Sequence, residues 1–246
     1  MQTFRADLHI HTVLSPCGDL EMSPANIVHA AKEKNIDIIG ITDHNSTKQC
    51  EVIKQVACSE GIFVMTGAEV TTKEEVHCLT FFETTEKLLE FQQYLDLHLP
   101  DIKNDTKLFG YQVVVDKEEN IVEEEDRLLI SALDQSLEDI EKKVHQLGGL
   151  FIPAHINKSK FSIISQLGFV PADLQFEALE ISKHVSKTDF LSKNRYLNKF
   201  TFIQDSDAHY VENIGDTSTR FLMEEISFEE IRMALAGING REVIVG

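Results

Sequence analysis

Two short motifs near opposite ends of the 246-residue chain contain side chains of the kinds that bind divalent metal ions. The motif DLHIHT begins at Asp7, and the motif DSDAH contains Asp207 and His209. Alternate side chains of a strand lie on one face, so Asp7, His9 and His11 are predicted to point together. Imidazole nitrogens and carboxylate oxygens at this spacing suit zinc, manganese or iron ions.

The elements that position these residues are predicted from apolar runs and helix signals. Residues 35–42, NIDIIGIT, form a continuous β-branched run, which is typical of a strand covered on both faces in a parallel sheet. Ser23 followed by Pro24 predicts the start of a helix before this strand. Later helices are predicted over Thr85 to Leu99, from Ser136 and from Ser227, and further strands over residues 62–66, 76–82, 150–152, 178–181, 200–203 and 243–245.

Several of these strands lead to a histidine or an acid. Because α/β sheets build their sites at the ends of their strands, we expect these side chains to meet at one rim. Each of them alone is typical of a helix cap, a solvated acid or a satisfied imidazole, but together they favour a shared metal centre. The residues are Asp43, His44, Glu69, His77, His155, Asp207 and His209, whereas His29, His98, His145 and His184 are predicted to be bystanders.

The alternation of strands and helices predicts one α/β domain over residues 1–246. A chain of this length can bury a substantial core as a single domain. Between about residues 101 and 133 the alternation is lost, and an acidic run extends from Glu123 to Asp126. We expect this stretch to be an irregular excursion on the surface.

The formal net charge of −18 predicts which partners the surface repels. We expect no binding to long duplex nucleic acid, although a metal-lined cleft can still attract a small anionic, phosphorylated substrate. No apolar run reaches the roughly 20 residues that cross a bilayer, and the N-terminus lacks a basic-then-apolar leader, so we expect a cytoplasmic protein without a membrane partner. The four cysteines form no regular framework and are predicted to be reduced, and the sequence does not predict an oligomeric state.

The motifs DLHIHT, ITDHN, PAH and SDAH, with the isolated Glu69 and His77 between them, resemble those of the polymerase and histidinol phosphatase (PHP) superfamily of metal-dependent phosphoesterases. The resemblance covers residues 4 to about 215, and the order of the motifs is highly specific. It implies a distorted seven-stranded (β/α) barrel, with two or three divalent metal ions, which we expect to be zinc, manganese or iron, at its rim. The ligand groups that it implies are His9, His11, Glu69 and Asp207 for one ion, Glu69, His77 and His155 for a second, and His44 and His209 for a third.

Cys17 departs from the family pattern. Relatives have a histidine eight residues after the first motif histidine, or an aspartate one residue before that, whereas this chain has Cys17 and Pro16. A thiolate at this position could bind the third metal ion and would favour zinc or iron over manganese or magnesium. The alternative is a third site that is weak or empty.

The expected chemistry is hydrolysis of a small phosphomonoester, or of a short nucleotide or oligonucleotide phosphodiester, by a hydroxide that bridges the metal ions. No motif for a protein nucleophile is present in the sequence. Asp43 is the candidate for proton transfer, and Asp7 is expected to accept a hydrogen bond from a ligand imidazole. Lys158 and Arg220 are the candidate cations for binding the phosphate of the substrate.

Two alternatives stay open from the sequence. The first is a metal-dependent amide or ester hydrolase, because a bridging hydroxide also attacks carbonyl carbon. The second is a domain that binds partners without catalysis and uses metal only for stability. The near-complete ligand set disfavours the second alternative, because a structural metal site needs only about four ligands.

Overall fold

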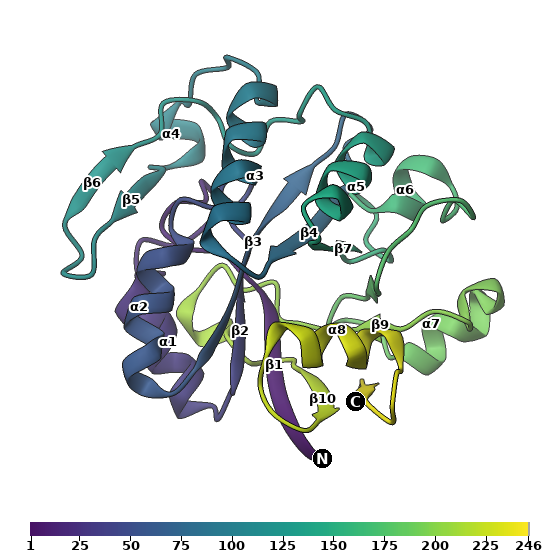
Figure 1. The fold of residues 1–246 in the computed structure, drawn as a ribbon. Coiled ribbons are helices and arrows are strands. Elements are labelled where there is room, and N and C mark those ends of the chain that lie inside the picture. The colour runs from purple at the N-terminus through teal and green to yellow at the C-terminus, as the bar shows by residue number, and fades with distance from the viewer. Residues whose placement is uncertain (246) are drawn as a thin grey trace.

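The computed structural model describes residues 1–245 as a curled sheet with helices around it (Figure 1). The helices are α1 (Pro24–Glu33), α2 (Cys50–Glu60), α3 (Thr85–His98), α4 (Thr106–Phe109), α5 (Leu137–Gln146), α6 (Ile163–Leu167), α7 (Lys187–Lys193) and α8 (Phe228–Ala236). The strands are β1 (Gln2–Ile10), β2 (Ile38–Ile41), β3 (Phe63–Thr71), β4 (His77–Phe82), β5 (Val113–Val115), β6 (Ile121–Glu124), β7 (Leu150–Pro153), β8 (Leu179–Glu180), β9 (Phe202–Ile203), β10 (Thr219–Met223) and β11 (Glu242–Ile244).

The main sheet has seven strands in the order β11-β10-β1-β2-β3-β4-β7. Strands β1, β2 and β3 are parallel, whereas β4 is antiparallel to both β3 and β7, and β10 is antiparallel to β1. Strand β2, within the predicted run of residues 35–42, pairs in parallel with both neighbours, as predicted. Because β4 runs in the opposite direction, its first residue, His77, lies at the same rim as the carboxyl ends of β1, β2 and β7.

The short parallel pair β8-β9 connects the two arms of the curled sheet. The backbone N–H of Ile156, after β7, donates to the carbonyl of Glu180 at 2.8 Å. On the other side, the N–H of Ala208 donates to the carbonyl of His9 at 3.1 Å, and the N–H of His11 donates to the carbonyl of Ala208 at 3.0 Å. The predicted distorted barrel is thus confirmed, although β8 and β9 contribute only two residues each.

Apolar side chains fill both faces of the curled sheet. Leu79 is the ladder partner of Glu69, so both lie on the concave face, where Leu8, Phe81 and Ile152 are also fully buried. On the other face, the strands pack against α1, α2, α3 and α5 (Figure 1). The metal-ligand candidates therefore lie next to a layer of apolar side chains. The packing of this layer fixes the positions of the strands that carry the candidates.

An irregularity in β1 changes the predicted faces of the first motif. Ala6 and Asp7 pair with Ile38 and Ile39, but Ile10 pairs with Ile41, so β1 has one residue more than β2 over this interval. A one-residue bulge moves the following side chains to the other face. The expectation that Asp7 and His9 share a face was therefore wrong.

Local sequence signals explain the helix starts. The Ser136 side chain accepts a hydrogen bond from Asp139 N, and the Asp139 carboxylate accepts one from Ser136 N, which forms a capping box. Pro24 lies at the start of α1, as predicted, and Ser227 caps α8. Residues 101–133 contain the short helix α4 and the hairpin β5-β6. In the described part of the chain, no helix has the length and apolar character to cross a membrane.

Candidate metal centre

Glu69 lies at the centre of a cluster of histidines at the rim. Its carboxylate oxygens are 2.9 Å from His77 Nδ1, 3.1 Å from His44 Nδ1 and 3.1 Å from His155 Nε2. It is 1% exposed, and burial alone would raise its pKa, but the surrounding imidazoles hold this pKa well below its usual range. The central carboxylate therefore stays negative and can bridge two cations.

His9 and His11 approach the same carboxylate from β1 and the residues after it. His9 Nε2 is 3.3 Å and His11 Nε2 is 3.4 Å from Glu69 oxygens. Both nitrogens also face Asp207 Oδ1, at 3.5 and 3.6 Å. The structure thus brings together the ligand group that the resemblance implies for the first ion.

Glu180 orients His9 and was missed by the reasoning from sequence. Its two oxygens are 3.0 and 3.1 Å from His9 Nδ1, and one of them accepts from His155 N at 2.7 Å. Burial opposes a charge on His9, but Glu180, Asp207 and Glu69 raise the pKa of its imidazole well above the usual value. The only available signal was an acid inside the apolar strand ALEI (residues 178–181).

His11 is oriented through Ser15 and Asp43. The Ser15 hydroxyl donates to Asp43 Oδ1 at 2.7 Å, so it accepts from His11 Nδ1 at 3.0 Å. This fixes the proton of His11 on Nδ1 and leaves the lone pair of Nε2 directed at Glu69. Asp43 also accepts from Thr12 N and Thr12 Oγ1, at 2.7 and 2.8 Å. Its carboxylate is thus used to hold the loop of His11, and its catalytic role stays a prediction.

Unpaired nitrogens show that the cluster fits metal ions. Among residues 1–245, His9 Nε2, His11 Nε2, His44 Nδ1 and His155 Nδ1 are buried and make no hydrogen bond of acceptable geometry, although the first three lie within 3.4 Å of a Glu69 oxygen. Such unsatisfied buried groups are rare and costly unless an unseen ligand binds them. The hydrogen bonds to Glu180 and Ser15 fix the tautomers of His9 and His11, and they leave two of these nitrogens free to bind a cation.

The backbone at two of the predicted ligands is strained. His155 has φ of 31° and Asp207 has φ of 52°, both in the left-handed region that residues with a Cβ seldom adopt. Strained residues of this kind cluster at functional sites, where surrounding contacts hold them. Here, His155 N donates to Glu180, and Lys158 N donates to the carbonyl of His155 at 2.9 Å.

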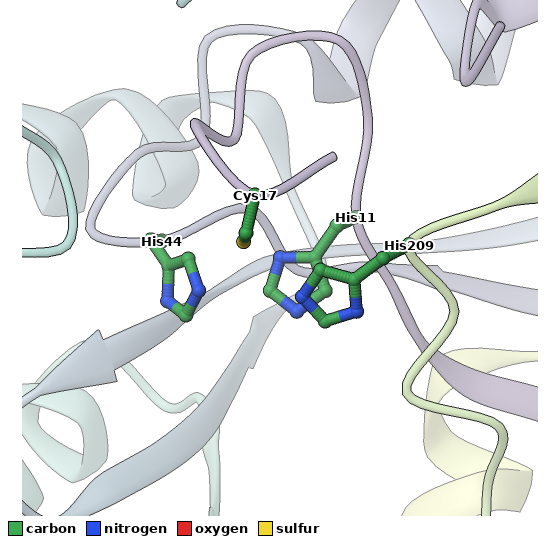
Figure 2. A group of neighbouring side chains, drawn as sticks. All are labelled: His11, Cys17, His44 and His209. Carbon is green, nitrogen blue, oxygen red and sulfur yellow. The ribbon is translucent and has the colours of Figure 1, made fainter. Parts of the chain in front are cut away.

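Cys17 lies with three histidines in a second group of possible ligands. One donor atom from each of Cys17, His11, His44 and His209 lies within 4.8 Å of the others (Figure 2). Burial and the nearby charge of Glu69 raise the pKa of the thiol, so the thiolate forms only when a cation is close. All nine predicted ligands are thus in one cluster, and their binding of metal stays a prediction.

A cavity of about 620 Å³ opens onto the cluster. Lys158 lines it, and its ammonium group forms an ion pair with Asp207 Oδ2. Lys160, Phe161 and His184 line the same cavity, and His184 is in none of the groups of possible metal ligands. The loop from Asn157 to Phe161 therefore brings two cations and an aromatic ring to the mouth of the site.

The structure contradicts the roles that were expected for Arg220 and Asp7. Arg220 is an exposed residue of β10, opposite Arg5 in the amino-terminal half of β1, and it is not among the residues that line the cavity. Asp7 accepts from the backbone N–H groups of Ser206 and Gly215, at 3.0 and 2.7 Å, instead of from a ligand imidazole. Its position follows from the β1 bulge, which turns it away from His9.

Comparison with known proteins agrees with this geometry. The PHP domain model matches residues 7–162, which is more than half of the chain. The uncharacterized protein YqxK of Bacillus subtilis is 27% identical over 99% of this chain and 65% of its own length.

Two solved structures resemble this fold. The lesion-specific endonuclease EndoQ from Pyrococcus furiosus has a TM-score of 0.75 at 20% identity, over 98% of this chain and 58% of that one. An amidohydrolase from Chromobacterium violaceum has a TM-score of 0.60 at 15% identity, over 98% of this chain and 97% of that one. At these identities the likeness concerns the fold alone. The chain also spans less than two thirds of the length of YqxK and of the endonuclease.

Proposed function

Because the chain belongs to the PHP domain family, we propose that it is a metal-dependent phosphoesterase that hydrolyses a small phosphomonoester or a short nucleotide phosphodiester. The observation that carries this proposal is the set of unpaired, buried imidazole nitrogens around Glu69, at the floor of a cavity that also contains Lys158. Cations at the floor and an ammonium group at the wall together suit a phosphate dianion.

The proposed sites follow the three ligand groups. His9, His11, Glu69 and Asp207 would hold one ion, and Glu69 would bridge to a second ion on His77 and His155. His44 and His209, with the Cys17 thiolate, would hold a third. Bound divalent ions would acidify a coordinated water and neutralise charge on the phosphoryl oxygens.

The side chains of this protein have separate parts in the proposed reaction. Glu180 and Ser15 keep His9 and His11 in one tautomer, so their Nε2 atoms stay available. Lys158 would move from Asp207 to a phosphoryl oxygen of the substrate once metal ions satisfy that carboxylate. Asp43 would accept a proton only after the loss of one of its present hydrogen bonds.

The proposal is tested by elemental analysis followed by a substrate panel. Protein purified without added metal should contain two or three equivalents of zinc, manganese or iron, with three supporting Cys17 as a ligand. The metal-loaded protein should release phosphate from a monoester or cleave a short diester. The Glu69→Gln variant should lose both the metal and the activity, and a protein that binds no metal would refute the proposal.

A second candidate function is metal-dependent hydrolysis of an amide or ester. The fold similarity to the Chromobacterium amidohydrolase favours including it, and the same ligand set suits attack on carbonyl carbon. Amide turnover without any phosphoester turnover in the same panel would favour this alternative. If His44→Ala changed no turnover and lowered only the melting temperature, a non-catalytic metal-stabilised domain would be favoured.

A further inference from the structure

A second pocket adjoins the proposed catalytic cavity. Its volume is about 430 Å³, and it shares Asn157, Lys158 and Ser159 with the catalytic cavity. Helices α6 and α7 form its walls, and Lys193 at the end of α7 lines it. The two pockets therefore adjoin at one short loop, and Lys158 lines both of them.

The segment around this second pocket is basic, although the whole protein is strongly acidic. Residues 157–199 contain seven Lys and Arg residues and four Asp and Glu residues, in a chain with a net charge of −18. Two of these acids point away from the pocket into internal contacts, because Glu180 bonds to His9 and Glu177 accepts from Phe151 N. Three of these seven cations, Lys158, Lys160 and Lys193, line the two pockets.

The lining of the second pocket combines charge with apolar surface. Lys193 is exposed and has no carboxylate partner among residues 1–245. The one acid in the lining, Asp189, already accepts from the Ser186 hydroxyl at 2.7 Å. Ile164 and Val185 supply apolar wall, and Asn157 and Asn194 supply amide groups.

We propose that the second pocket binds the phosphate and sugar next to the cleaved bond of a short single-stranded oligonucleotide. This inference rests on the proposed phosphoesterase function and names its substrate class. A free cation suits a neighbouring phosphate, and the apolar wall suits the sugar and base that lie between two phosphates. Phe161, which is 41% exposed and stacked on His77 in the first cavity, gives a base an aromatic partner.

A single strand suits this groove better than a duplex. The net charge of −18 repels an extended polyanion outside the basic segment. A chain of a few nucleotides would place its phosphates only over the two adjoining pockets. We therefore expect affinity to increase with length up to about the span of both pockets and then to stop increasing.

The test is binding of a fluorescein-labelled, hydrolysis-resistant phosphorothioate oligothymidylate of five nucleotides to the metal-loaded protein, followed by fluorescence anisotropy at several salt concentrations. The slope of log affinity against log salt is negative, and it should become less steep by about 0.7 in Lys193→Ala. This change corresponds to the loss of one phosphate contact in a single strand. Lys193→Arg should keep the slope. Lys117→Ala, which removes an exposed lysine before β6 and distant in sequence from the basic segment, is the matched control and should also keep it.

Kinetics gives a second readout. The ratio of kcat/KM for the five-nucleotide strand to that for bis(p-nitrophenyl) phosphate should fall about tenfold in Lys193→Ala and stay constant in Lys117→Ala. An unchanged salt slope in Lys193→Ala would overturn the second site, whether or not the protein is active. Absence of all phosphoester turnover would instead refute the proposed function. In that case, a less steep salt dependence of binding in Lys193→Ala would still support binding of a phosphate at the second pocket. Tight binding of only a nucleoside bisphosphate, with no further gain from longer strands, would also overturn the oligonucleotide assignment.

Discussion

Replacement of Glu180 by glutamine should weaken metal binding without unfolding the protein. Glu180 is 1% exposed, contacts His9 Nδ1 at 3.0 Å and accepts from His155 N at 2.7 Å. Glutamine preserves the volume and one acceptor oxygen, so the bond from His155 N can persist. It removes the negative charge that makes His9 a stronger ligand.

The expected magnitude follows from the loss of this one charged partner. Removal of the group that orients a ligand histidine typically lowers metal affinity about 10- to 100-fold, or about 1.4–2.8 kcal/mol. In Glu180→Ala, His155 N also loses its partner inside the protein, which adds about 1–3 kcal/mol of destabilisation. We therefore expect the metal-free Gln variant to melt near the wild-type temperature and the Ala variant to melt well below it.

Glu177 provides a matched control three residues earlier. It accepts from Phe151 N at 2.7 Å and lies 3.2 Å from His145 Nε2, so it has the same kinds of partner as Glu180. His145 is not part of the metal cluster. Zinc affinity, measured by competition with a chromophoric chelator, should fall in Glu180→Gln and stay within about twofold of wild type in Glu177→Gln. Equal zinc affinities in wild type and Glu180→Gln would refute the reasoning, as would an equal loss in the control.

Three further changes test other parts of the structure. In cobalt-loaded protein, Cys17→Ser should remove the sulfur-to-metal charge-transfer absorption and about one equivalent of bound metal. Gly67→Ala should destabilise the protein by about 3 kcal/mol or more in chemical denaturation, because its Cβ would lie 1.7 Å from the Thr80 carbonyl oxygen. His145→Gln should lower the melting temperature more at about pH 6 than at alkaline pH. The Glu177 carboxylate, 3.2 Å from Nε2, raises the pKa of His145 in the folded state, and the stabilisation is lost as the pH rises through that raised pKa.

Each of these changes has its own control. Cys58→Ser, at an exposed cysteine outside the cluster, should leave the cobalt spectrum unchanged. Ala68→Gly at the next position should cost much less than Gly67→Ala, and similar losses would contradict the steric account. A pH-independent difference between wild type and His145→Gln would contradict the assigned pKa shift. A cobalt spectrum that is identical in wild type and Cys17→Ser would mean that Cys17 is not a metal ligand and that only histidines bind the third ion.

The ligand candidates were predictable because their chemistry is rare and their spacing is local. His9 and His11 share one motif, and the apolar runs correctly predict that the histidines after β2 and β7 reach the same rim. Helix starts at Ser136 and Pro24 were predictable for the same local reason, because capping uses atoms within a few residues.

The strand directions were less predictable. The predicted strand over residues 62–66 extends in the structure to Thr71, which leaves five residues before His77. Five residues are too few for the crossover that parallel strands need, so β4 must return antiparallel. Glu69 consequently lies within β3 instead of after it, and only the true length of β3 reveals this.

Non-local contacts account for the remaining errors. Glu180 acts on a histidine 171 residues away, and no spacing rule connects positions that far apart. The bulge that separates Asp7 from His9 depends on pairing with β2, which the first motif alone does not encode. Arg220 follows the last motif in sequence, but β10 returns along the amino-terminal half of β1 and takes it away from the cavity.

The backbone hydrogen bonds that join Ala208 to His9 and His11 have a consequence for synthesis on the ribosome. His9 and His11 leave the ribosome well before Asp207 and Ala208, which complete the rim through the backbone bonds between Ala208 and both histidines. Until Asp207 and Ala208 emerge, the nascent chain exposes an incomplete set of chelating groups. Contacts this distant in sequence also form slowly, so we expect metal capture to follow the formation of these contacts.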